Sequence, residues 1–101
     1  MSVMHITKEN FKELVLENEK PVLLDFWAAW CGPCRIVGPI IDQIAEEHPE
    51  LAVGKVDVDA EQNLAQAFGV SSIPTLVAIK DGKVVNRTVG AQPKAEILKM
   101  F

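Results

Sequence analysis

The two cysteines of the sequence lie three positions apart, in the segment WCGPC at residues 30–34. Thiols at this spacing can bind a metal, form a structural disulfide or exchange electrons with another protein. A structural zinc site needs four ligands, but there is no second cysteine pair, and His5 and His48 lie in separate elements without ligand spacing. A disulfide that closes a loop of two residues restricts the unfolded chain very little. The spacing therefore favours redox chemistry.

The position of the cysteines predicts a different role for each. Cys31 follows an apolar run of strand length, VLLDFW at 22–27, and it precedes a stripe of helical spacing that reaches His48. At the start of a helix the unpaired N–H groups and the helix dipole stabilise a thiolate and lower its pKa. We therefore expect Cys31 to be the nucleophile. Cys34, one turn further and more buried, would resolve the mixed disulfide.

Asp25 is the most unusual residue of the predicted strand. A carboxylate inside a buried strand is costly unless it is paired or neutral. From the residues alone, Asp25 and Lys55 of the next strand are interpreted as a structural ion pair.

The surrounding pattern predicts an α/β fold with a mixed sheet. Strand-like segments at 3–6, 22–27, 51–58, 75–80 and 83–89 alternate with helical ones, and Asp81-Gly82 predicts a hairpin between the last two strands. Thr7 is the expected N-cap of the first helix, and Asp59 with Gln62 forms a capping box for the third. Ile36, Val37, Ile40, Ile41, Ile44 and Ala45 form the expected apolar stripe of the second helix.

Length and charge limit the classes of function. The chain has 101 residues, which is about one domain (1–101). Its net charge of −4, with no basic stripe, argues against a nucleic-acid partner. Its first residues have no leader pattern and its apolar runs are too short to span a membrane, so we expect a cytoplasmic protein without a membrane partner.

Several motifs together resemble the thioredoxin family. They are FWAAWCGPC, SIPTL some forty residues later, the Asp inside the preceding strand, Pro39, and DGKVV followed by VGA, and they cover essentially the whole chain. The resemblance implies the thioredoxin fold, with a central sheet of about five strands and four helices on both faces. It also implies a monomeric protein dithiol-disulfide oxidoreductase that carries a redox-active Cys31–Cys34 disulfide, needs no bound cofactor or metal, reduces disulfide-containing proteins and is recharged by a reductase.

The resemblance also implies roles for individual residues. Asp25 would lie beneath Cys34 and accept its proton, with Lys55 modulating that carboxyl. Pro74 would follow a cis peptide bond, and the Ile73 backbone would pair with an extended substrate segment. The other expected substrate-binding residues are Trp30, Gly32, Pro33, Gly90 and Ala91.

Two other classes of protein share this fold. Oxidants and isomerases usually carry a histidine between the cysteines, whereas this sequence has Gly-Pro. A redox-inert binding module would not need the intact Cys31, Cys34 and Asp25. The chain departs from the usual pattern at Gly38, where alanine is common, in lacking tyrosine, and in a short final helix.

Overall fold

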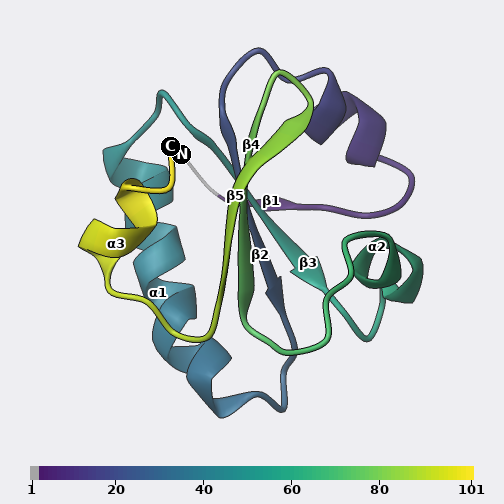
Figure 1. Ribbon diagram of the computed structural model, residues 1–101, viewed down its shortest axis with the longest axis vertical. Coiled ribbons are helices and arrows are strands. Elements are labelled where there is room, and N and C mark those ends of the chain that lie inside the picture. Colours follow the sequence, from purple (N-terminus) through teal and green to yellow (C-terminus); the bar gives the residue numbers. More distant parts are fainter. Residues whose placement is uncertain (1–2) are drawn as a thin grey trace.

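A five-stranded mixed sheet separates two layers of helices (Figure 1). The computed structural model describes residues 3–101. The strands lie in the order β1-β3-β2-β4-β5. Their bounds are β1 Met4–His5, β2 Val22–Trp27, β3 Ala52–Asp57, β4 Thr75–Lys80 and β5 Lys83–Val89. Strands β1, β3 and β2 are parallel, whereas β4 is antiparallel to β2 and β5, which confirms the predicted mixed sheet.

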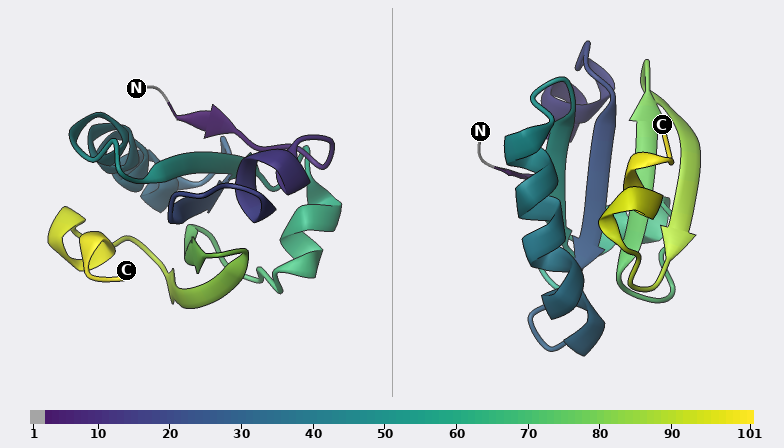
Figure 2. Two further views of the ribbon diagram at one scale, coloured as in Figure 1. Left: turned by 90° about the horizontal axis from the view of Figure 1, so that it is seen from above. Right: turned by 90° about the vertical axis from the view of Figure 1, so that its left-hand side faces the viewer.

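Helical elements cover both faces of the sheet (Figures 1 and 2). Their bounds are η1 Lys12–Leu16, α1 Gly32–Glu47, α2 Gln62–Ala67 and α3 Lys94–Leu98. Side chains of α1 and α3 share one buried cluster with Leu23 and Leu76, and side chains of η1 and α2 share another with Leu24 and Val77. The alternation of neighbouring strand residues between these clusters explains why β2 is apolar on both faces.

Helix α1 is fixed against the sheet by a narrow apolar stripe. Val37, Ile41 and Ile44 are 0% exposed, and burial of each contributes about 1.5–3 kcal/mol. Ile36 was expected in this stripe but is 65% exposed, because the row that faces the sheet passes through Val37 instead. Pro39 lies inside the helix, which is one continuous element from Gly32 to Glu47.

Two predicted helix starts are wrong. Thr7 and Asn10 exchange hydrogen bonds between side chain and backbone, as in a cap, but the turn they close precedes a five-residue π-helical element that begins only at Lys12. Helix α2 has no side-chain cap at all. The carboxylate that accepts the N–H groups of the preceding turn belongs to Asp57 rather than Asp59.

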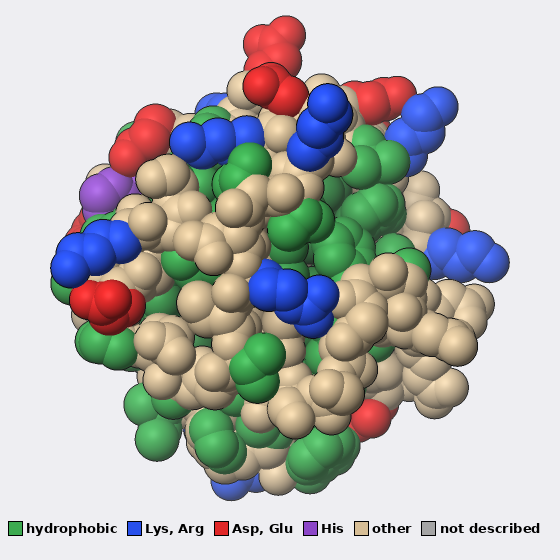
Figure 3. All heavy atoms as spheres, in the orientation of Figure 1, with side chains coloured by type: hydrophobic (Ala, Val, Ile, Leu, Met, Phe, Trp, Pro, Cys, Tyr) green, Lys and Arg blue, Asp and Glu red, His purple; other side chains and the backbone are tan. Residues whose placement is uncertain are grey.

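The hairpin between β4 and β5 is confirmed. Asp81 and Gly82 both have positive φ, 53° and 74°, which is the backbone form that a two-residue hairpin turn requires. Strand β5 forms one edge of the sheet and is mostly exposed. Lys and Arg side chains intermingle with Asp and Glu on the face seen in Figure 3, without a large area of one sign.

Candidate active site

The two cysteines form a disulfide at the N-terminus of α1. Cys31 is the N-cap residue, Cys34 lies in the first turn, and their Cα atoms are 5.3 Å apart. The Cys34 N–H donates a hydrogen bond of 3.2 Å to the Cys31 sulfur. Gly32 and Pro33 occupy the first helical positions, where proline costs no backbone hydrogen bond. The positive end of the helix therefore points at the Cys31 sulfur.

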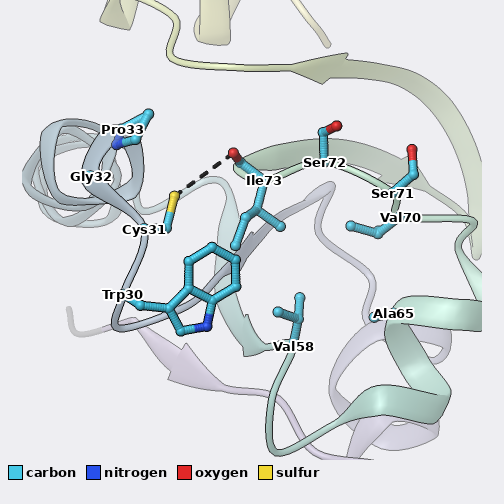
Figure 4. A pocket seen from close by; sticks show the side chains of 10 residues that line it. All are labelled: Trp30, Cys31, Gly32, Pro33, Val58, Ala65, Val70, Ser71, Ser72 and Ile73. Carbon is cyan, nitrogen blue, oxygen red and sulfur yellow. Dashed lines mark hydrogen bonds between the residues drawn. The ribbon is translucent and has the colours of Figure 1, made fainter.

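A mostly apolar groove of about 500 Å³ opens beside Cys31 (Figure 4). The Cys31 sulfur lies 3.7 Å from the carbonyl oxygen of Ile73, a residue of the loop before β4. Ten residues line the groove: Trp30, Cys31, Gly32, Pro33, Val58, Ala65, Val70, Ser71, Ser72 and Ile73. The groove thus joins the start of α1 to the loop before β4, and a segment bound in it would contact the Cys31 sulfur.

The expected difference in burial between the cysteines is wrong. Cys31 is 4% exposed and Cys34 is 6% exposed, because Trp27, Val58 and Ile73 pack around the disulfide. What distinguishes the two sulfurs is position, since Cys31 lines the groove and Cys34 does not.

The expected substrate-binding residues fall into two groups. Trp30, Gly32, Pro33 and Ile73 line the groove, whereas Pro74, Gly90 and Ala91 do not. The Ile73–Pro74 peptide bond is cis, as the resemblance predicts. Pro74 is buried, and its carbonyl oxygen accepts a 2.8 Å hydrogen bond from the Gly90 N–H. Gly90 has a φ of 94°, and the exposed Ala91 follows it. Gly90 therefore lies beside Pro74, the residue that follows Ile73.

Trp30 is held at the groove by Asp59, a residue for which the sequence predicted a different role. The indole is 68% exposed, and its Nε1–H donates a 2.9 Å hydrogen bond to Asp59. Asp59 was expected to cap α2. The two residues are 29 positions apart, so no local pattern indicated the contact. Asp59 fixes the indole while leaving its apolar face open to a ligand.

The Asp25 carboxyl is buried, and one of its two oxygens has no hydrogen-bond partner among residues 3–101. The residue is 1% exposed, and that oxygen is Oδ1. Burial raises the pKa of Asp25 from 3.8 to about 6, while the Lys55 charge opposes this shift and the Asp42 charge adds to it. Lys55 lies beside Asp25 in the register of β3 and β2, but its ammonium pairs with Asp42 of α1 at 3.2 Å. Sequence reasoning missed Asp42, although its position eight residues after Cys34 places both on one side of the helix.

The described part of the chain has neither a metal cluster nor a membrane-spanning helix. Within residues 3–101, no three His, Cys, Asp or Glu side chains are grouped so that they could hold a metal ion. No helix of that range combines the length and the apolar composition that a membrane crossing requires.

A disulfide at the N-cap of a helix, beside an apolar groove and a cis-proline loop, defines the class of thiol-disulfide oxidoreductases. The Thioredoxin family model matches residues 2–101. A putative thioredoxin 2 of Streptomyces coelicolor is 50% identical over 96 residues, which are 95% of this chain and 71% of that protein. Thioredoxins of Chlorobaculum thiosulfatiphilum and Mycobacterium tuberculosis are each 48% identical, covering 92% and 97% of this chain and 87% and 85% of the relatives.

The chain belongs to the thioredoxin family. It is a protein disulfide oxidoreductase with the fold that the sequence predicted. Its redox group is the Cys31–Cys34 disulfide, and proteins of this family use no bound cofactor.

Proposed function

We propose that this protein is a general reductant of disulfides in other proteins. The Cys31 thiolate attacks one sulfur of a substrate disulfide, forms a mixed disulfide and releases the first substrate thiolate. Cys34 then attacks the Cys31 sulfur, which releases the second substrate thiolate and leaves the Cys31–Cys34 disulfide. Two electrons pass to the substrate. The observation that carries this assignment is that Cys31 lines the groove, whereas Cys34 does not. The Cys31 sulfur also accepts a hydrogen bond from the Cys34 N–H.

Asp25 is the proposed proton acceptor for Cys34. A thiol must lose its proton before it attacks, and a base with a pKa close to the working pH does this best. Burial brings the pKa of Asp25 to about 6, within reach of neutral pH. Lys55 modulates this carboxyl through its charge.

The substrate is proposed to bind as an extended segment along the groove. The backbone of Ile73 pairs with that segment, because the residue lies at an open end of the sheet, just before β4 begins at Thr75. Trp30, Gly32 and Pro33 form the opposite wall. Pro74 and Gly90 support the Ile73 loop, and the exposed Ala91 widens the contact beyond the groove.

The partners and the cellular setting complete the proposal. A separate reductase, as is general in the family, returns two electrons to the disulfide, so that the protein acts as an electron carrier. We propose a monomer that works in the cytoplasm, without nucleic-acid or membrane partners.

Trapping of substrates tests the mechanism. With Cys34→Ser, mixed disulfides should accumulate on Cys31 in a cell lysate, and mass spectrometry of the captured proteins should locate each bond. The double variant Cys31→Ser/Cys34→Ser is the matched control and should capture none. Failure of the single variant to trap any disulfide-linked protein would refute the mechanism. Insulin reduction with dithiothreitol then separates a reductant, which accelerates it, from a redox-inert scaffold, which does not.

A further inference from the structure

One side of α1 carries three residues spaced by four, Cys34, Gly38 and Asp42. Lys55 reaches this side of the helix from β3. Its Nζ lies 3.2 Å from Asp42 Oδ1, and a Cβ placed on Gly38 would lie 3.6 Å from the same nitrogen. The Lys55 ammonium therefore passes Gly38, one turn below Cys34, and ends at Asp42.

This pairing differs from the one that the strand register favours. Asp25 and Lys55 are direct neighbours in the parallel register of β2 and β3. The ion pair nevertheless joins Lys55 to Asp42, and Asp25 Oδ1 has no partner among residues 3–101. Asp42 is 61% exposed in its side chain and Lys55 19%, so the pair lies at the rim of α1 with its anion in solvent. Asp25 stays buried and forms no ion pair with Lys55, although the Lys55 charge still lowers its pKa.

We propose that Asp42 is a positioning residue that holds the Lys55 ammonium at the rim of α1 and so keeps the Asp25 carboxyl free of an ion pair, able to accept the proton of Cys34. This inference rests on the role proposed above for Asp25. A carboxylate that pairs directly with an ammonium is a weaker base. Asp42 competes with Asp25 for the Lys55 ammonium, and this competition preserves the basicity of Asp25.

The charged groups around Asp25 are few. Lys55 faces it from β3 and Asp42 acts on it from α1, and among residues 3–101 these are the two charges that affect its pKa. Its neighbour on β4 is Leu76, which carries no charge. Besides Asp42, α1 contributes the Cys34 thiol of the reduced protein as a titratable group. Removal of Asp42 therefore leaves Asp25 as the acid beside Lys55 in the sheet.

The variant Asp42→Asn tests the inference through the titration of Asp25, followed by ¹³C NMR of its carboxyl in the oxidised protein. The pKa of Asp25 should fall by about half to one pH unit, because Lys55 becomes free to pair with it. Asp42→Glu keeps the anion and should restore most of the wild-type value. Glu46→Gln removes the same charge one turn further along α1 and should leave the titration of Asp25 unchanged.

A second background separates positioning from a direct effect of the Asp42 charge. In Lys55→Met, the further change Asp42→Asn should lower the pKa of Asp25 by less than half as much as in the wild-type background. A fall of equal size in both backgrounds would overturn the inference, and so would an unchanged or raised pKa in Asp42→Asn.

The rate of mixed-disulfide resolution by Cys34 reports on the proposed role of Asp25 itself. In the wild type this rate should fall as the pH drops through the pKa of Asp25. In Asp42→Asn that fall should move to lower pH, together with the NMR titration of Asp25. If the NMR titration moves and the fall in rate does not, the role of Asp25 as proton acceptor is wrong, and Asp42 then positions Lys55 without serving the reaction, which overturns the functional half of the inference.

Discussion

Replacement of Asp25 with asparagine should make the protein progressively more stable than the wild type as the pH rises from about 4 to neutral. The folded-state pKa of Asp25 is raised from 3.8 to about 6, because burial penalises its charged form. A raised pKa means that the folded protein holds the proton more tightly than the unfolded chain. The stabilising contribution of this group is therefore full below 3.8 and is lost as the pH rises through about 6.

The size of the effect follows from the same shift. One pKa unit corresponds to about 1.4 kcal/mol, so a shift from 3.8 to about 6 costs the wild type on the order of 3 kcal/mol once the group is ionised. Asparagine does not titrate. The stability of Asp25→Asn relative to wild type should therefore grow by about 2–3 kcal/mol between about pH 4 and about pH 8.

Urea denaturation of the oxidised proteins, followed by circular dichroism at several pH values, measures this difference. An unsatisfied asparagine amide in the buried site would change the free energy of unfolding of the variant by the same amount at every pH. The diagnostic quantity is therefore how the difference between variant and wild type changes with pH. Asp81→Asn makes the same substitution at an exposed hairpin position and should show no such growth. A difference between Asp25→Asn and wild type that stays constant with pH would refute the argument. If Asp25 serves Cys34, the variant should also resolve mixed disulfides more slowly.

Alkylation, stability and hydrogen exchange test three other features of the site. Iodoacetamide should label Cys31 of the reduced protein before Cys34, since only Cys31 lines the groove, and peptide mapping would reveal the opposite order. Gly38→Ala should raise the free energy of unfolding in urea by about 0.5–1 kcal/mol, because the added Cβ meets one side chain at 3.6 Å; a loss would contradict this. Asp59→Ala should speed exchange of the Trp30 indole N–H in NMR, and an unchanged rate would show that the hydrogen bond is absent in solution.

The sequence predicted best those elements that local patterns define. The strands at 22–27, 75–80 and 83–89 have the expected bounds, because apolar runs and the Asp81-Gly82 turn specify them within a few residues. Helix ends were less predictable, since Asp57 and Asp59 are equally able to cap. Asp59 instead accepts a hydrogen bond from Trp30, which is 29 positions away in the sequence, so no local pattern could distinguish the two residues.

The places of the main candidate site residues in the fold were predicted, but their contacts were not. The motif placed Cys31 at the start of a helix and Asp25 in a buried strand, and both positions are confirmed. The partner of Lys55 was not predicted, because Asp25 is its neighbour in register whereas Asp42 belongs to a helix that crosses the sheet. The burial of Cys31 was underestimated, since its cover comes from Val58 and Ile73, far along the chain.

The distance along the chain between Cys31 and Ile73 has a consequence for synthesis. These residues meet across the groove but are 42 positions apart, so the ribosome makes both thiols well before the loop that covers them. At roughly 5–20 residues per second, the delay is about 2–8 seconds. During that interval the nascent chain carries two thiols that lack the cover of the Ile73 loop. Until the loop has been made, oxidants and other thiols therefore reach the Cys31 and Cys34 sulfurs more easily than in the folded protein.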